Sequence, residues 1–488
     1  MIMDSNAHTL VLDVGKSNAK LVLFNAEGDV IARRVRANHS VQTPHYLALG
    51  LDALQAWVQE SVPTLPEHAR IGRIGITTHG AAFCAVNGSG LALPAIDYEW
   101  DGYGELRADY ASRIDGFETT GTPLLPLGLN AGLQLFWLQQ TQPEAWQGIE
   151  AWLPYPQYWA WWFTGVAAYE VSSLGCHTHL WQPARNRFAP WAVREGLVER
   201  FPPLRLAYEA IGPVQPALAE RLGLPAGCVV YAGLHDSNAC LARHLHALPG
   251  ASVVSTGTWC VVMTPGVTGR EQALDPAREQ LFNQSIEGRP VPTARFMGGR
   301  EFAHLCHGAD PALATESALH EVLEAGWLVL PGHDAGPAAN FGQAGEIVRG
   351  DQPMGSAPQV VPLHLRPALA AMYCAMMTTR ILFDLLPLAL RGNPQRSDAL
   401  SVVILEGPLA DNPAYAAALS ALLAPLAVVR SQDEVEGTAR GAWLSTRWAM
   451  PSHGRDAYAS VPPPTAQVSH SLLQRFRQWS TVADEALV

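Results

Sequence analysis

Residues 12–20 read Leu-Asp-Val-Gly-Lys-Ser-Asn-Ala-Lys, which combines a carboxylate, a glycine, two lysines and two small polar side chains. The Gly-Lys-Ser triplet suggests a P-loop, which requires a glycine five positions before its Gly-Lys and a helix directly after it. The required glycine position is Leu10, inside an apolar run, and residues 19–24 continue as a strand. The P-loop interpretation therefore fails on both requirements.

The same turn can instead be a β-hairpin whose backbone approaches a phosphate group. Its glycine admits close approach, its Ser and Asn side chains can donate to phosphate oxygens, and its lysines can neutralise charge. The candidate phosphate-binding residues are Gly15, Lys16, Ser17, Asn18 and Lys20. Asp13 would repel a phosphate unless a cation lay between them, so it predicts Mg²⁺ held through water. The alternative is an ordinary hairpin with a capping aspartate.

Two further polar turns follow apolar runs in the middle of the chain. Residues 251–266 repeat the opening pattern, since two predicted strands flank the small-residue turn at 255–258. Two such turns, one from each half of the chain, could hold one triphosphate. In residues 228–245, Asp236 lies between the end of a strand and the start of a helix, where a carboxylate can accept the proton of an attacking alcohol. Its alternative role is that of a helix N-cap.

The composition argues against several classes of function. The formal charge is −12 and no long basic run offsets it, so we expect no nucleic-acid partner. The seven cysteines show no paired spacing, which predicts reduced, mostly buried thiols in a cytoplasmic protein, and 176–179 and 306–307 are interpreted as structural rather than metal-binding. We expect no signal peptide, because residues 1–13 have no basic region ahead of an apolar stretch. We also expect no membrane partner, because no apolar run reaches ~18 residues. The charged fraction of 16% predicts a large buried interior and is compatible with a homodimer.

The predicted elements follow an order that differs from the strand–helix alternation of a doubly wound nucleotide-binding fold. Three strands come first, then a helix over 44–61 and a short buried strand that ends at 78–80. A long apolar helix is predicted over 366–390, and residues 436–448 are predicted to form a helix whose small residues permit close backbone approach. The tryptophan-rich residues 158–165 are interpreted as helical core rather than as sugar-stacking platforms. A chain of 488 residues exceeds one ordinary core, so the repeated pattern predicts a duplicated domain.

Taken together, these segments resemble the FGGY carbohydrate kinases, a family within the actin–hexokinase–heat-shock-chaperone ATPase superfamily. The segments that carry the resemblance are DVGKSNAK (13–20), IGITTHG (74–80), the stretch 120–165, and IGPVQPALAERLGLPAGCVVYAGLHDSNA (211–239). They occur in the family's order and span residues 8–450. The long ordered series makes the resemblance specific.

The resemblance implies an α/β fold of two ribonuclease-H-like domains of the actin-like ATPase type, with an active-site cleft between them. Residues 1–245 would hold the sugar and the first phosphate hairpin, and residues 246–488 would bind the nucleotide. The implied activity is that of a transferase of carbohydrate metabolism, which moves the γ-phosphoryl group of ATP to a sugar hydroxyl with Mg²⁺ as cofactor.

The resemblance also implies roles for individual residues. Asp236 would be the general base, and Asp13 and Asp236 would hold Mg²⁺. The residues implied to bind the sugar are His79, Gly80, Glu99, Asp101, His235 and Asp236. The residues implied to bind the nucleotide are Gly15, Lys16, Ser17, Asn18, Lys20, Thr256, Gly257, Thr258, Gly407 and Asn412.

The substrate is less narrowly implied. His235-Asp236 with residues 255–259 is similar to rhamnulokinases, whereas Asn18 is similar to L-fuculokinases, so an L-ketose such as L-rhamnulose or L-fuculose is the first expectation. Xylulose, ribulose or a polyol is the alternative, and an actin-like ATPase or an inactive sugar-binding homologue also stays open. Two departures stand out: Lys16 replaces the family's usual Thr or Ala, and 406–408 (Glu-Gly-Pro) replaces three glycines.

Overall fold

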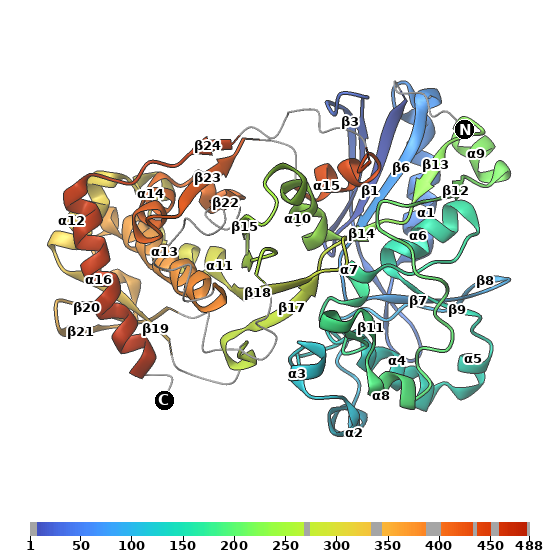
Figure 1. Ribbon diagram of the computed structural model, residues 1–488, viewed down its shortest axis with the longest axis horizontal. Coiled ribbons are helices and arrows are strands. Elements are labelled where there is room, and N and C mark those ends of the chain that lie inside the picture. The colour runs from blue at the N-terminus through green and yellow to red at the C-terminus, as the bar shows by residue number, and fades with distance from the viewer. Residues whose placement is uncertain are drawn as a thin grey trace. The chain divides into compact units, whose positions relative to one another are not determined.

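The computed structural model describes residues 7–267, 274–332, 344–386, 402–432, 437–449 and 458–485 (Figure 1). The chain divides into two compact units. Unit 1 comprises Met1–His246, Phe282–Pro290 and Glu434–His453, and unit 2 comprises Ala247–Leu281, Val291–Asp433 and Gly454–Val488. The sequence predicts two domains that are each one continuous segment, 1–245 and 246–488. These limits stay a prediction.

Unit 1 is built on a seven-stranded sheet with the first strand of the chain near its centre. In order across the sheet, the strands are β12 (Ala210–Pro213), β13 (Val229–Tyr231), β6 (Ile71–Thr78), β1 (His8–Val14), β2 (Asn18–Phe24) and β3 (Val30–Ala37), with β14 (Leu234–His235) also paired to β6. The first three strands form an antiparallel meander, as the sequence predicts. Strand β6 runs parallel to β1, and β13 and β14 run parallel to β6.

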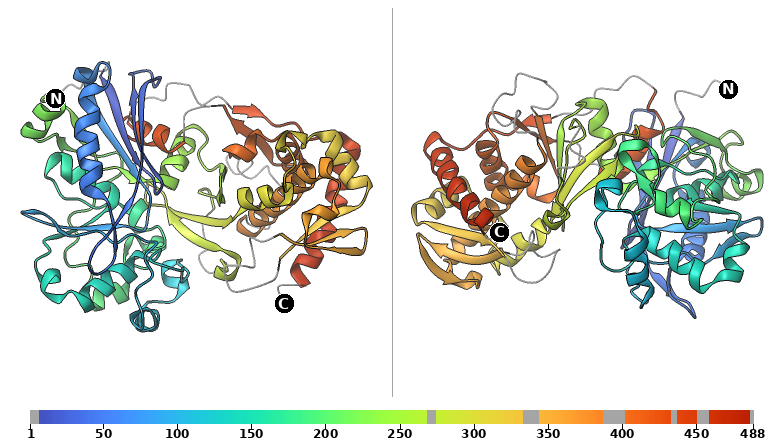
Figure 2. Two further views of the ribbon diagram at one scale, coloured as in Figure 1. Left: turned by 180° about the vertical axis from the view of Figure 1, so that it is seen from behind. Right: turned by 60° about the horizontal axis from the view of Figure 1, so that its bottom comes forward.

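Alternate residues of β1 support two separate cores. Leu10 and Leu12 pack on the face that carries α1 (Leu51–Ser61) and α6 (Tyr155–Thr164), whereas Val11 packs in the cluster of the opposite face. Figure 2 shows α1 lying along the strands of this sheet. Because successive side chains of a strand point to opposite faces, a strand covered on both sides needs a continuous apolar run. Trp159 of α6 is fully buried, so the tryptophan-rich segment does fill a core.

The second face of the sheet is covered by two helices that approach very closely. They are α10 (Asp236–Ala247) and α15 (Gly437–Ser445). A Cβ atom on Gly441 would lie 1.8 Å from the carbonyl oxygen of Ala239. The predicted close backbone approach of this small-residue helix is therefore confirmed, and α10 is the helix that begins with Asp236.

The helix predicted over 44–61 begins later than expected. Residues Leu47–Leu49 form strand β5, which pairs with β4 (Ser40–Gln42), and α1 starts only at Leu51. Between them, a Cβ on Gly50 would lie 2.5 Å from the carbonyl oxygen of His39. Only a glycine fits at position 50, because the two segments pass this closely. Residues 47–49 are compatible with a helix, but they form a strand because they pair with β4.

Unit 2 repeats the strand order of unit 1. Across its sheet the strands are β18 (Pro290–Phe296), β16 (Cys260–Met263), β15 (Ser252–Thr256), β22 (Val402–Glu406), β23 (Ala427–Ser431) and β24 (Tyr458–Ser460). Strand β17 (Gln280–Gln284), of which the residues from Phe282 on are counted in unit 1, pairs with β18 at the edge of this sheet. Strands β15, β16 and β18 form an antiparallel meander, and β22 and β23 continue parallel to β15. A meander followed by two parallel strands thus occurs twice, which confirms the predicted duplicated α/β fold.

A long apolar helix forms the interior of unit 2. Helix α13 (Arg366–Leu385) and the turn before it give 23 residues, Leu363–Leu385, that are long and apolar enough to cross a membrane. Of the most apolar window, 89% is buried inside the structure, and α11 (Gly298–Cys306) and α14 (Pro413–Leu422) pack against the helix. The expectation that no apolar segment is long enough was therefore wrong for this helix, because arginines interrupt its apolar letters. The predicted residues 387–390 lie outside the described chain.

The remaining elements complete the two units. The other helices are α2 (Leu106–Arg113), α3 (Phe117–Thr120), α4 (Ala131–Thr141), α5 (Pro143–Gln147), α7 (Val171–Leu174), α8 (Pro190–Arg194), α9 (Pro216–Leu222), α12 (Glu316–Glu324) and α16 (Ala466–Glu485). The small sheets contain β7 (Phe83–Asn87), β8 (Gly90–Leu93) and β9 (Ala151–Pro154), then β10 (Trp181–Gln182) and β11 (Arg187–Phe188), and β19 (Trp327–Pro331), β20 (Ala344–Arg349) and β21 (Gln352–Gly355).

Candidate active site

Three strand ends meet at one edge of the unit 1 sheet. Thr78 of β6 is in register with Val14 of β1 on one side and with His235 of β14 on the other. The backbone N–H of His79 also donates to the carbonyl oxygen of Val14 at 2.9 Å. Because these strands are parallel, the residues after their carboxyl ends gather at this edge, where open α/β sheets bind ligands. The edge brings together the turn after Val14, His79 and Asp236.

Asp236, the predicted base, is an oriented carboxylate. Its Oδ1 accepts a hydrogen bond from the backbone N–H of Ser237 at 2.6 Å and lies 3.0 Å from Nε2 of His235. Burial opposes ionisation, but His235 outweighs it and holds the pKa of Asp236 below its ordinary value. The side chain keeps 30% of its surface exposed, so a ligand can reach a carboxylate that stays ionised.

His235 lies behind this carboxylate with both ring nitrogens engaged. Its Nε2 faces Asp236 and also lies 3.7 Å from Sγ of Cys176, and its Nδ1 lies 3.2 Å from the side-chain amide of Asn238. Burial would lower the pKa of His235, but Cys176 and Asp236 outweigh it and raise that pKa well above its ordinary value. The geometry therefore makes His235 a group that orients Asp236, while its predicted contact with the sugar stays a prediction.

Sequence reasoning missed Cys176, which the Cys-His-Thr-His segment offered only as a structural residue. Burial disfavours its thiolate, but His177 and His235 outweigh burial and lower the pKa of Cys176 to about 5. His179 of the same segment contacts the Tyr110 hydroxyl at 2.8 Å instead. Within the described ranges, no group of three or more His, Cys, Asp or Glu side chains is arranged to hold a metal ion. Only the fold brings this cysteine next to His235, the histidine that orients Asp236.

His79 presents a free nitrogen at the same edge. Its Nδ1 contacts the carbonyl oxygen of Gly80 at 2.8 Å, whereas its Nε2 is buried and has no hydrogen-bond partner among the described residues. The rings of Tyr98 and Tyr155 meet the imidazole edge-on at 5.4 and 5.0 Å. Burial lowers the pKa of His79, so the ring is neutral. Because an unsatisfied buried nitrogen costs about 1–3 kcal/mol, Nε2 is suited to a ligand hydroxyl.

The two carboxylates that the sequence predicts to bind the sugar, Glu99 and Asp101, have different partners. Glu99 lies 3.1 Å from Nζ of Lys16, which also contacts the buried carboxylate of Asp97. Asp101 pairs instead with Arg107 at 2.6 Å and remains 63% exposed. Lys16, which the sequence predicts to bind phosphate, thus contacts Asp97 and Glu99. These two residues lie in the loop that carries the predicted sugar-binding residues Glu99 and Asp101, here called the sugar-side loop.

The other residues of the first hairpin lie at or next to its turn. Gly15 and Ser17 lie in its turn and Asn18 is the first residue of β2; Ser17 and Asn18 are exposed, and the Gly15 N–H donates to the Asn18 carbonyl at 2.9 Å. Asp13 is 4% exposed, pairs across the strands with Lys20, and its Oδ2 accepts a hydrogen bond from the Thr438 hydroxyl at 2.8 Å. The turn presents small polar groups outward, and Asp13 is held rigidly beneath it.

The corresponding turn of unit 2 is tied to the strand beside it. The hydroxyl of Thr256 donates to the carbonyl of Glu406 at 2.7 Å and accepts from the backbone N–H of Leu409 at 3.0 Å. Gly257 and Thr258 follow as exposed turn residues. The first turn of α11, which sequence reasoning did not single out, packs directly here, because a Cβ on Gly299 would lie 2.0 Å from the Gly257 carbonyl oxygen.

Gly407 is required by the same contact. Its φ is +86°, and a Cβ there would lie 1.9 Å from the carbonyl oxygen of Thr256. We expect Gly407→Ala to destabilise unit 2 by about 3 kcal/mol, from the left-handed backbone and the clash together, and to raise KM for ATP. Chemical denaturation and steady-state kinetics measure both effects. Gly355→Ala is the matched control, because Gly355 has the same φ but open space around it, and only about 1 kcal/mol is expected. Equal losses in the two variants would refute a role for the contact.

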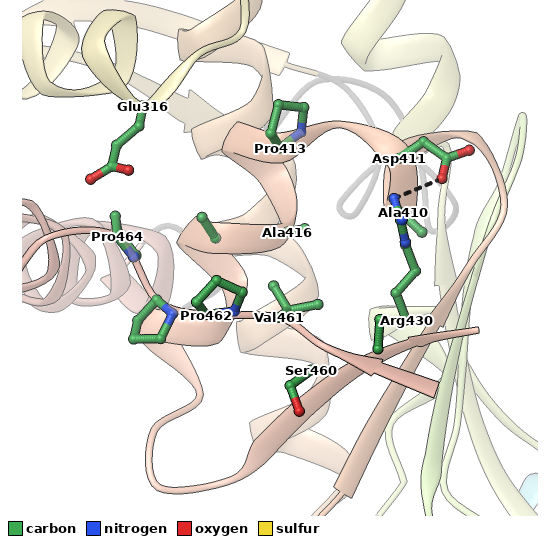
Figure 3. A pocket seen from close by; sticks show the side chains of 13 residues that line it. Glu316, Ala410, Asp411, Pro413, Ala416, Arg430, Ser460, Val461, Pro462 and Pro464 are labelled. Carbon is green, nitrogen blue, oxygen red and sulfur yellow. Dashed lines mark hydrogen bonds and ion pairs between the residues drawn. The ribbon is translucent and has the colours of Figure 1, made fainter. Parts of the chain in front are cut away.

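A cavity of about 360 Å³ borders the next segment (Figure 3). Alanine and proline side chains form most of its walls, and the Asp411–Arg430 ion pair, 3.1 Å long, lies at one side. Asn412 caps α14 by accepting a hydrogen bond from the backbone N–H of Tyr415 at 3.0 Å. Ala410 and Asp411, which line the cavity wall, lie between Gly407 and Asn412, the two residues of this segment that are predicted to bind the nucleotide.

Two family models match successive parts of the chain. Residues 8–242 match the N-terminal domain of the FGGY family of carbohydrate kinases, and residues 249–454 match the C-terminal domain of carbohydrate kinase FGGY. The chain belongs to the FGGY family of carbohydrate kinases. A crystal structure of a carbohydrate kinase from Novosphingobium aromaticivorans is 32% identical, covers 99% of this chain and 100% of its own, and superposes with a TM-score of 0.86.

Curated relatives match shorter parts of the chain. The L-fuculokinase of Escherichia coli (strain K12) is 27% identical over 268 residues, which is 52% of this chain and 56% of that enzyme. A xylulose kinase of Staphylococcus epidermidis is 30% identical over 194 residues, or 38% of this chain and 34% of that enzyme. The chain therefore spans about half the length or less of these relatives, which act on different sugars by name.

The structure explains why the chain keeps a glycine at only one of the three positions 406–408. Where the family resemblance places three glycines, this chain keeps only the middle one, Gly407. That position alone combines a positive φ with a backbone contact too close for a Cβ. Glu406 is 8% exposed and Pro408 opens a short 3-10 turn, so neither position requires a glycine here.

Proposed function

We propose that the chain transfers the γ-phosphoryl group of ATP to a hydroxyl of a neutral sugar, with Asp236 as the general base. The observation that carries this proposal is the ionised, partly exposed carboxylate of Asp236 at the sheet edge that also presents the free Nε2 of His79. Membership of the carbohydrate kinase family supports the reaction type.

In this reaction the chain's own groups position the acceptor. A sugar hydroxyl is a weak nucleophile, and Asp236 would orient its oxygen and accept its proton as the new O–P bond forms. His79 Nε2 would hydrogen-bond a neighbouring hydroxyl and fix which oxygen faces the phosphoryl group. His235 and the N–H of Ser237 would keep the carboxylate of Asp236 in one orientation throughout.

The carboxylates fit a magnesium ion that is held mainly by phosphate and water. Asp13 and Asp236 offer hard oxygen ligands, and Mg²⁺ in phosphoryl transfer is usually bound by one or two carboxylates together with phosphates and water. When bound, the ion would neutralise charge on the phosphates. The exposed residues at the two hairpin turns, Ser17 and Asn18 in unit 1 and Gly257 and Thr258 in unit 2, would contact those phosphates through backbone N–H groups and small polar side chains.

The charges around His79 favour a neutral substrate. Three carboxylates lie here, those of Asp97, Glu99 and Asp236, and the two cationic side chains beside them, Lys16 and His235, are already paired with them. A carboxylate on the sugar would meet uncompensated negative charge. We therefore propose a ketose, first L-rhamnulose or L-fuculose and second xylulose, ribulose or a polyol. The partial similarity to an L-fuculokinase and to xylulose kinases supports this order.

ADP release with ATP·Mg²⁺ tests this proposal. We expect release to depend on a neutral ketose and to be at least tenfold slower, in kcat/KM, with aldonic acids of the same carbon number. Release without any sugar would replace the proposal by an actin-like ATPase, and tight sugar binding without release would replace it by an inactive sugar-binding homologue. Equal activity on aldonates would refute the charge argument. We place the activity in the cytoplasm, since six of the seven cysteine thiols are buried.

A further inference from the structure

The first hairpin holds both lysines of the chain. Among the 32 basic residues of the sequence, only Lys16 and Lys20 are lysines. Lys16 is also the residue that departs from the family's usual Thr or Ala in the phosphate-binding hairpin. The contacts of Lys16 therefore decide whether this replacement affects the binding of the nucleotide phosphates or the binding of the sugar.

The ammonium group of Lys16 has no donor left for a phosphate. An ammonium carries three N–H bonds, and three protein oxygens surround it: the carboxylate of Asp97, Oε2 of Glu99 at 3.1 Å and Oγ of Ser40 at 3.2 Å. The Ser40 hydroxyl donates in turn to the same carboxylate of Asp97. The hydrogen-bonding capacity of Lys16 is thus used within unit 1.

The charge of Lys16 is more than balanced by the same neighbours. Asp97 is fully buried, and although burial opposes its ionisation, hydrogen bonds from Lys16 and Ser40 hold its pKa below the ordinary value. One ammonium faces two carboxylates, so the group has a net charge of −1. A phosphate gains no electrostatic attraction from such a group.

The same contacts fix the loop that carries the sugar-side residues. The backbone N–H of Glu99 donates to Oδ1 of Asp97 at 2.9 Å, so the anchored aspartate also shapes the loop backbone. The Lys16 ammonium lies 5.3 Å from the centre of the Tyr98 ring, within the range of a cation–π contact. The Tyr98 ring packs in turn against His79, whose Nε2 is free. Lys16 therefore supports the imidazole indirectly through Tyr98.

We propose that Lys16 is a specificity-determining positioning residue of the sugar side, and not a ligand of the nucleotide phosphates. It ties residues 97–99 to the first hairpin and holds Tyr98 against His79. The role rests on the proposed sugar kinase activity, and it replaces the phosphate role expected from the position of Lys16 in the sequence. A residue in the phosphate hairpin of this family would then select the sugar.

Lys16→Thr, which introduces a residue type usual in the family, separates the two roles. We expect KM for the best ketose of the activity panel to rise at least tenfold, and KM for ATP to change less than twofold. Lys20→Thr removes the same charge from the same hairpin and is expected to raise KM for ATP instead. A rise in KM for ATP with an unchanged sugar KM in Lys16→Thr would overturn the proposal, and so would equal rises of both constants.

A folding defect is controlled by removing the whole charge pair. Lys16→Thr leaves the buried carboxylate of Asp97 without a cationic partner, whereas the double variant Lys16→Met/Asp97→Asn leaves no unpaired buried charge. We expect the double variant to unfold at a denaturant midpoint close to wild type and to keep the raised sugar KM. Recovery of the wild-type sugar KM would overturn the positioning role.

A binding measurement separates failure of this inference from failure of the proposed function. Because the sequence has two lysines, labelling with lysine enriched in ¹³C at Cε gives two side-chain NMR signals, and Lys20→Arg assigns them. L-rhamnulose and L-fuculose are the sugar probes, and a non-hydrolysable ATP analogue with Mg²⁺ is the nucleotide probe. We expect a sugar probe to shift the Lys16 signal and the nucleotide not to. A shift with the nucleotide alone, or with neither, would overturn the inference even if the enzyme phosphorylates a sugar.

Discussion

Asp236→Asn is expected to lower kcat for sugar phosphorylation by about 10²–10⁴-fold, the usual contribution of a positioned general base. The amide keeps the size of the carboxylate but cannot accept the hydroxyl proton. His235 Nε2 and the Ser237 N–H, which both face Oδ1, would still find an acceptor in the amide oxygen. The fold is therefore expected to persist, and sugar-dependent ADP release measures the loss.

A matched control removes a carboxylate of unit 1 that lies elsewhere. Asp109 sits on α2 in an ion pair with Arg113, both partly exposed, so Asp109→Asn should change kcat less than twofold. Thermal unfolding of both variants confirms that they are folded. If Asp236→Asn retained more than a fifth of the wild-type kcat, Asp236 would not be the base.

Gly441→Ala is expected to destabilise unit 1 by about 3 kcal/mol and to lower kcat about 10²-fold. Helix propensity alone predicts the opposite sign, since alanine stabilises a helix interior by ~1 kcal/mol relative to glycine. The added Cβ would lie 1.8 Å from the Ala239 carbonyl oxygen, and backbone cannot rotate away as a side chain can. Helices α10 and α15 must then separate, and a shift of about 1 Å in α10 moves Asp236 at its first residue.

Denaturant unfolding and kinetics test this prediction together. Gly227→Ala is the control, because a Cβ there meets nothing within 4 Å, and its effect should stay within about 0.5 kcal/mol. A stabilised Gly441→Ala variant would show that propensity outweighs packing at this contact. A destabilised variant with unchanged kcat would show that Asp236 does not depend on the position of α10.

Much of the fold was predictable because its local patterns agree with its tertiary contacts. The run of apolar residues in β1 is continuous, which a strand needs when it is buried on both faces, and the repeat at 251–266 does form the corresponding strands of unit 2. The helix over 44–61 was partly wrong because residues 47–49 pair with β4, a contact that local sequence does not contain. The long apolar helix predicted over 366–390 is confirmed as α13 (Arg366–Leu385) within the described residues.

In the candidate site, too, local sequence identifies some residues but does not reveal contacts between residues far apart in the chain. Asp236 and His79 were recognisable, since each directly follows a strand and polar residues at strand ends gather at one sheet edge. Cys176 and Asp97 were not, because their importance comes from His235 and Lys16, which are 59 and 81 residues away along the chain. Long-range pairs of this kind leave no trace in local spacing.

By itself, the sequence determined the order of strands and turns, the duplicated fold, the family resemblance and the residue types available for phosphoryl transfer. These follow from apolar periodicity and from polar residues at strand ends, which are local properties. Only the tertiary structure decided what those residues touch. It placed Lys16 on Asp97 and Glu99 instead of leaving its ammonium free, and it set Cys176 beside His235. The reason is physical: the charge and hydrogen bonds of a side chain are directed by whichever partners packing brings within about 3 Å.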